Sequence, residues 1–68
     1  MNKGPQISVV MTVFNGERFI KEAIDSILNQ TFKDFEFIIV DNASTDKTKQ
    51  IVHSYEDQRI IFIENSQN

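Results

Sequence analysis

The fold of this chain is decided by residues 37–46, which run Phe37-Ile38-Ile39-Val40-Asp41-Asn42-Ala43-Ser44-Thr45-Asp46. Four successive apolar residues are typical of a strand that is buried on both faces, as in a parallel sheet. The run stops at Asp41, after which Ser44 or Thr45 is expected to cap a helix that has Asp46 in its first turn. Ligands of open α/β sheets bind beyond the carboxyl ends of the strands. We therefore expect Asp41 to face a ligand that carries sugar or nucleotide hydroxyls.

A similar strand and helix precede this stretch. Residues 7–13 are rich in β-branched side chains and predict a strand, which Asn15-Gly16 interrupts. From Glu17 the apolar residues recur at spacings of one, three and four, as on one face of a helix. We expect this helix to have Asn15 as its N-cap and to end near Asn29-Gln30.

A second helix and a third strand are expected to complete the fold. The second strand spans residues 35–40, and the following helix has a narrow apolar face around residues 51–55. Asp57-Gln58 predicts a turn, and residues 59–64 predict the third strand. The order is β-α-β-α-β, and right-handed crossovers make the three strands parallel with spatial order 3-2-1. This α/β arrangement is half of a doubly wound nucleotide-binding fold.

The first strand would be central in a complete sheet of this kind, but its outer edge has no partner in this sequence. An exposed apolar strand edge invites pairing with another chain. We therefore predict either part of a longer protein or a domain that forms a homodimer to cover that edge.

The composition argues against several functional classes. A chain of 68 residues makes one small domain or a piece of a larger one, and it buries only about 60% of the surface that its unfolded form exposes. It has no cysteine, so no disulfide can stabilise it. The formal charge of -3 argues against a nucleic-acid-binding module, and no apolar run predicts a transmembrane segment. We expect residues 1–6 to be a flexible lead, residues 7–65 the folded part and residues 66–68 a tail.

Three residues are candidates for ligand binding: Asp41, Thr12 and Phe14. Alternation along the first strand puts Thr12 and Phe14 on one face, and a hydroxyl and a ring beside Asp41 would bond and stack a flat base. Two plainer interpretations stay open. Asp41 is also the residue type that bonds loop amides, and Phe14 is also a typical core residue.

Other chemistry finds little support in the residues alone. Neither a G-x-G-x-x-G loop nor a P-loop is present, and no acidic phosphorylation cluster marks a regulator domain. His53 has no second histidine or cysteine with which to bind a metal, and Glu56-Asp57 is expected to be a solvated turn. The residues therefore indicate half of a binding site, without a catalytic apparatus.

Several separated segments together resemble family 2 glycosyltransferases, and the resemblance covers residues 7 to about 65. They are, in order, residues 7–17 (ISVVMTVFNGE), 23–31 (AIDSILNQT), 34–48 (DFEFIIVDNASTDKT) and 57–60 (DQRI). The resemblance implies a GT-A, Rossmann-like fold of which this segment is the N-terminal, nucleotide-binding part. It also implies transfer of a sugar, with inversion, from a nucleotide-sugar, usually a UDP-sugar, to an acceptor hydroxyl of a saccharide or glycolipid.

The resemblance also implies roles for the candidate residues. The position of Asp41 bonds the uracil or its ribose neighbourhood, that of Thr12 lies near the base, and that of Phe14 is often a tyrosine that stacks on or borders the base. Many relatives have a second Asp and a Gly where this chain has Asn42 and Ala43, so neither of these two is assigned a binding role.

The family's metal and catalytic base are expected outside this chain. A D-x-D motif beyond the third strand would hold Mg²⁺ or Mn²⁺, and no such motif occurs here, so no catalytic residue or metal ligand is assigned. We expect the isolated chain to be inactive and the whole enzyme to work in the cytoplasm or at the inner face of the membrane. The alternative is a non-catalytic α/β binding or assembly module that pairs through its open strand edge.

Overall fold

A computed structural model describes residues 7–66 and has the predicted order of elements. The elements are β1 (Ile7–Val13), α1 (Ile20–Leu28), β2 (Phe35–Asn42), α2 (Thr48–His53) and β3 (Ile60–Asn65). All strand pairs are parallel and the sheet order is β1-β2-β3, which confirms the predicted order 3-2-1. The predicted lead, residues 1–6, and the last two residues of the predicted tail lie outside the described residues.

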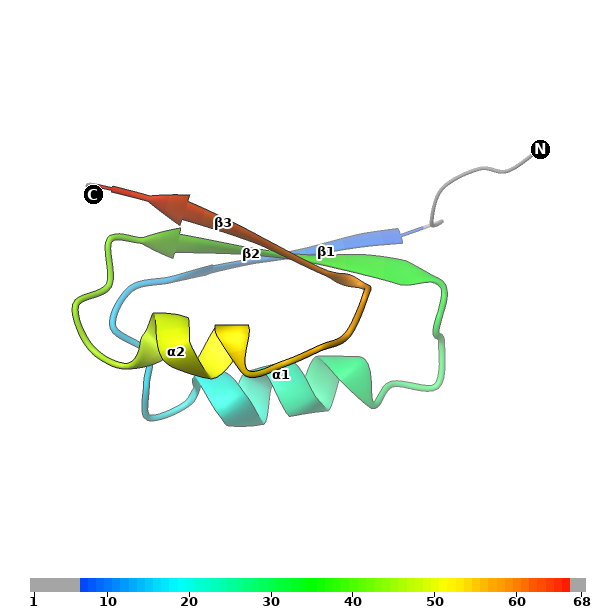
Figure 1. Ribbon diagram of the computed structural model, residues 1–68. Helices are drawn as coiled ribbons and strands as arrows, with labels where there is room; N and C mark the ends of the chain where they lie inside the picture. Colours follow the sequence, from blue (N-terminus) through cyan, green and yellow to red (C-terminus); the bar gives the residue numbers. More distant parts are fainter. Residues whose placement is uncertain (1–6, 67–68) are drawn as a thin grey trace.

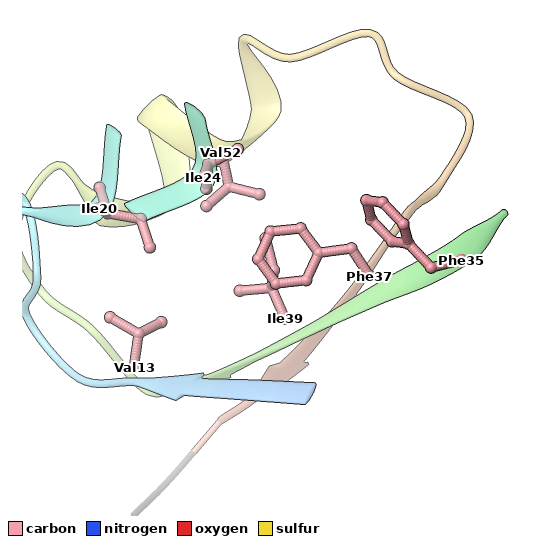
Figure 2. Packing of buried hydrophobic residues seen from close by; sticks show 7 residues of the cluster. All are labelled: Val13, Ile20, Ile24, Phe35, Phe37, Ile39 and Val52. Carbon is pink, nitrogen blue, oxygen red and sulfur yellow. The ribbon is translucent and has the colours of Figure 1, made fainter. Parts of the chain in front are cut away.

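Both helices cover the same face of the sheet (Figure 1). Every second residue of β2 faces them, and Phe37 and Ile39 are completely buried there. Figure 2 shows how side chains from the strands point toward those of the helices. The resulting core consists of Val13, Ile20, Ile24, Phe35, Phe37, Ile39 and Val52.

The opposite face of the sheet is not covered by any described residue, so the expectation that β2 is buried on both faces is wrong for residues 7–66. Ile38 and Val40 are only partly buried, and Val10 beside them in β1 is 61% exposed. The reason is geometric. Two successive right-handed crossovers that move in the same direction across a sheet place both helices on one side.

The helices begin later than the sequence pattern predicts. α1 starts at Ile20 rather than at Glu17, because residues 17–19 form a turn in which the Gly16 carbonyl accepts from the amides of Phe19 and Ile20. No side chain caps α1.

Likewise, α2 starts at Thr48, and neither Ser44 nor Thr45 is its N-cap. Asp46 does lie beside the first turn, where its carboxylate accepts from the Thr48 amide at 2.9 Å. Ser44 and Thr45 instead form hydrogen bonds with Asn15, which lies between β1 and α1. No helix within residues 7–66 is long and apolar enough to cross a membrane.

A charged turn fixes the start of β3. The Asp57 carboxylate accepts from the Arg59 backbone amide at 2.9 Å and from its guanidinium at 2.7 Å, and the guanidinium lies 4.8 Å from the centre of the Phe35 ring. Hydrogen bonds from the Arg59 side chain and backbone lower the pKa of Asp57 to about 2. The pair Glu56-Asp57 is thus a solvated turn only at Glu56, which is exposed.

We expect Asp57→Asn to lower the free energy of unfolding at pH 7 by about 1 kcal/mol, because a neutral amide bonds Arg59 less strongly. Since the folded pKa of Asp57 is about 2, its stabilisation is present above the ordinary carboxyl range near pH 4 and is lost as pH falls toward 2. Urea unfolding at pH 7 and pH 2.5 should therefore show a smaller acid-induced loss in the variant. Glu56→Gln is the control, and equal pH dependence in Asp57→Asn and wild type would refute the account.

Candidate functional site

Two loops meet at the carboxyl end of the sheet, the end toward which the strand arrows point in Figure 1. We call residues 14–19, between β1 and α1, the first loop, and residues 43–47, between β2 and α2, the second loop. Asn15 binds the second loop through both its backbone and its side chain. Its amide donates to the Ser44 hydroxyl at 2.8 Å, and its Oδ1 accepts from the amides of Thr45 at 2.8 Å and Asp46 at 3.3 Å. Asn15 therefore caps the second loop and not α1.

Further hydrogen bonds run between the loops in both directions. The Gly16 amide donates to the hydroxyl of Thr48 at 2.8 Å, and that buried hydroxyl donates in turn to Asp46. The Glu17 amide donates to Asp46 at 3.1 Å, while the Glu17 carboxylate accepts from the Lys47 amide at 2.9 Å. Desolvation alone would raise the pKa of Asp46, but the hydrogen bonds from Thr48 and the Glu17 amide outweigh it and leave this pKa below the ordinary value. The two loops thus satisfy each other's backbone groups.

The backbone of each loop needs an unusual conformation at one residue. Asn15 has φ 51° and Ala43 has φ 61°, both in the left-handed region, which asparagine tolerates better than alanine. Gly16 is required for a different reason. A Cβ atom there would lie 2.6 Å from Val13 Cγ2 and 2.7 Å from Phe19 Cζ. The Asn-Gly pair therefore serves the close approach of the first loop to the core.

Asp41 lies at the centre of this edge and is completely buried. Its Oδ2 accepts from the Ser44 amide at 3.0 Å and its Oδ1 accepts from the Ser44 hydroxyl. The side chain points to the helix-covered face, like Phe37 and Ile39. In this structure Asp41 bonds the second loop, the plainer of the two interpretations above, and its predicted contact with a nucleotide stays a prediction.

The structure does not bring Thr12 and Asp41 together. The register of the parallel sheet pairs Val13 with Asp41 and Thr12 with Val40, so the side chain of Thr12 lies on the uncovered face. The expected pocket with Thr12 beside Asp41 is therefore wrong. Phe14 follows β1 directly and is 51% exposed, so it is not a core residue.

Two asparagines to which no binding role was assigned from the sequence, Asn42 and Asn65, share the uncovered face with Thr12. Asn42 is two residues beyond Val40 in β2, and Asn65 is its partner in β3. Asn65 Nδ2 donates to Asn42 Oδ1 at 2.8 Å, which joins the ends of the two strands. Thr12 pairs with Val40 in β2, and Asn42, two residues further along β2, has its side chain on the same face as Val40. Asn42 can therefore be placed beside Thr12 only when the alignment of the two strands is known.

Other polar groups lie away from this edge. His53 is 61% exposed, and its Nε2 lies 3.2 Å from Glu64 Oε2, a contact that joins α2 to β3. A surface hollow of about 330 Å³ lies at the opposite end of the sheet, between the starts of β2 and β3. Among residues 7–66, no three His, Cys, Asp or Glu side chains gather closely enough to hold a metal ion.

Because Ala43 has a positive φ, replacing alanine by glycine should have opposite effects on the free energy of unfolding at position 43 and in the middle of α1. We expect Ala43→Gly to raise the free energy of unfolding by about 0.5–1 kcal/mol, because glycine adopts positive φ without the cost paid by a Cβ. Ala23→Gly, in the middle of α1, should lower it by about 1 kcal/mol. Urea unfolding of both variants measures these changes in free energy. A lower free energy of unfolding for Ala43→Gly would contradict the positive φ of Ala43.

Comparison with known proteins identifies the family that this chain resembles in sequence and in structure. A sequence model described as Glycosyl transferase family 2 matches residues 8–68. An uncharacterized glycosyltransferase of Methanocaldococcus jannaschii is 52% identical over 68 aligned residues, which cover 94% of this chain and 23% of that protein. The UDP-Glc:alpha-D-GlcNAc-diphosphoundecaprenol beta-1,3-glucosyltransferase WfaP of Escherichia coli is 38% identical over 60 residues, 88% of this chain and 24% of WfaP.

A solved structure agrees with the sequence matches. The mannosyltransferase PcManGT from Pyrobaculum calidifontis, in complex with GDP-Man and Mn2+, matches with a TM-score of 0.83 and 26% identity over 98% of this chain and 21% of that chain. The chain thus spans about a quarter of the length of these relatives. The three parallel strands and their helices are the corresponding part of a GT-A fold. The chain belongs to glycosyltransferase family 2.

Proposed function

We propose that the carboxyl edge of this sheet binds the nucleotide of a nucleotide-sugar donor, as part of an inverting glycosyltransferase. The proposal is carried by Phe14, whose side chain is half-exposed at this edge. The hydrogen bond from the amide of Asn15, the next residue, to the Ser44 hydroxyl holds the backbone here. This ring stands at the carboxyl ends of parallel strands, where a ligand of an open α/β sheet would cover it. A flat base would do so, and stacking on an aromatic side chain is worth about 1–3 kcal/mol per base.

Each candidate residue has a distinct proposed role. Phe14 stacks on the base, and the Thr12 hydroxyl and the amides of Asn42 and Asn65 offer hydrogen bonds from the uncovered face. Asp41, which the sequence analysis proposes as a direct contact to the uracil or ribose, is held by Ser44 and completely buried. A contact between Asp41 and the nucleotide would need the second loop to open.

We propose a UDP-sugar as the donor, and WfaP, named for UDP-Glc, supports this choice. The structure of PcManGT holds GDP-Man, so GDP is the natural competitor in an experiment. The acceptor would be a hydroxyl of a saccharide or glycolipid, and the place of action the cytoplasm or the inner face of the membrane.

The chemistry of transfer needs groups that we place elsewhere in the protein. In the whole protein the acceptor hydroxyl would attack the anomeric carbon as the nucleoside diphosphate leaves, and a base would take the hydroxyl proton. A divalent metal, when bound, would supply positive charge for the leaving group. The carboxylates of residues 7–66 do not fit a metal, since no three of them gather and Asp41 is engaged by Ser44. We therefore assign Mg²⁺ or Mn²⁺ to a D-x-D motif outside this chain and expect the isolated chain to transfer no sugar.

We expect the chain to bind UDP weakly and Phe14→Ala to weaken binding about tenfold, because loss of stacking removes more than 1 kcal/mol. Titration with UDP and with GDP, followed by amide chemical shifts, measures both. The matched control is Phe32→Ala. Phe32 lies in the loop before β2 and is 44% exposed, and loss of its ring should leave nucleotide binding unchanged.

The alternative function is assembly through the uncovered face and through the edge of β1 that pairs with no strand within residues 7–66. The exposed Val10, Ile61 and Ile63 on that face are the observation that favours it. If neither nucleotide shifts any resonance at the carboxyl edge, and the chain self-associates as its concentration rises, this alternative replaces the nucleotide-binding proposal.

A further inference from the structure

We infer that Ser44 is a positioning residue of the proposed nucleotide site, because its hydroxyl couples the buried Asp41 to the loop that carries Phe14. The expected effect of Ser44 on nucleotide affinity rests on the proposed function. The coupling itself is a property of the free chain and can be tested without a ligand.

The Ser44 hydroxyl links the second loop to the Asn15 amide, directly after Phe14 in the chain. It donates to Asp41 Oδ1 and accepts from the Asn15 amide at 2.8 Å, while the Ser44 amide donates to Asp41 Oδ2 at 3.0 Å. The Asn15 amide belongs to the peptide unit that joins Asn15 to Phe14. Because this unit is planar, fixing its N–H direction also fixes the backbone on which Phe14 stands.

The hydroxyl of Ser44 uses both its donor and its acceptor capacity here, and few side chains can replace it. The donor faces a buried carboxylate, which strengthens the bond, and the acceptor receives a backbone amide. Ser44 is itself only 7% exposed, so water has little access to replace it. Alanine would leave a carboxylate oxygen and an amide without their partner, whereas threonine keeps the hydroxyl.

The coupling gives Asp41 a role without direct contact to the nucleotide. The carboxylate orients Ser44, Ser44 orients the Phe14–Asn15 peptide unit, and this unit sets the position of the ring. A residue that acted only on global stability would change affinity independently of Phe14. A residue that acts through Phe14 loses its effect once the ring is gone.

A double-mutant cycle on UDP affinity tests this coupling. The variants are S44A, F14A and the double variant, titrated with UDP and followed by chemical shifts. We expect S44A and F14A each to weaken binding about tenfold, and the double variant to be weakened about tenfold as well, rather than a hundredfold. S44T should restore wild-type affinity. S54A is the matched control, because Ser54 is exposed and its hydroxyl bonds only the Ile51 carbonyl at the end of α2.

Two measurements keep the outcomes separate. If S44A does not fold, S44C takes its place in the cycle, since cysteine keeps the volume and bonds only weakly. If wild type binds no nucleotide, the proposed function fails, and the coupling is judged in the free chain by amide exchange of Asn15. That exchange should accelerate at least tenfold in the alanine or cysteine variant and not in S44T. Additive losses of affinity, or unchanged Asn15 exchange, would overturn the inference.

Discussion

The structure depends on hydrogen bonds that the backbone amides of each loop at the carboxyl end of the sheet donate to side chains of the other loop or of Thr48, the first residue of α2. Asn15 satisfies two amides of the second loop, and Asp46 and Thr48 satisfy amides of the first. The hydrogen bond from the Gly16 amide is buried and that from the Asn15 amide is partly buried, and an unpaired buried amide would cost about 1–3 kcal/mol. In a chain this small, with a correspondingly small core, a few such groups are comparable with the whole free energy of unfolding. The pairing of the loops therefore contributes to the stability of the fold and fixes the shape of this edge.

This constraint explains why the polar residues at the edge divide into two sets. Those of the first set, Asp41, Ser44 and Thr48, are buried: Ser44 donates to Asp41, and the Thr48 hydroxyl accepts from the Gly16 amide and donates to Asp46. Thr12, Asn42 and Asn65 lie on the uncovered face, and Phe14 is exposed just beyond β1. The first set gives rigidity, and the second set offers the groups that can meet a ligand. Asp41 holds the second loop through Ser44, and its contact with a nucleotide stays a prediction.

The sequence pattern was sufficient for the order of elements, the parallel sheet and the exact bounds of β1 because these follow from local periodicity and from the handedness of crossovers. It was insufficient for the starts of the helices. Asn15 and Ser44 have the residue types of helix caps, but their partners lie in the other loop, about thirty positions away along the chain. Local rules do not contain such partners. The face of Asp41 was missed for a related reason, since its position relative to Thr12 depends on the register between β1 and β2.

Amide hydrogen exchange of the free chain tests the pairing of the loops most directly. The amides of Asn15, Gly16 and Thr45 lie in loops, where exchange is ordinarily fast, yet each donates to a side chain of the opposite loop or of the first turn of α2. If the loops form one hydrogen-bonded unit, these three amides are protected to a degree comparable with the Phe37 amide in the core strand β2. Exchange of all three at the rate of unstructured peptide, while Phe37 stays protected, would contradict the account.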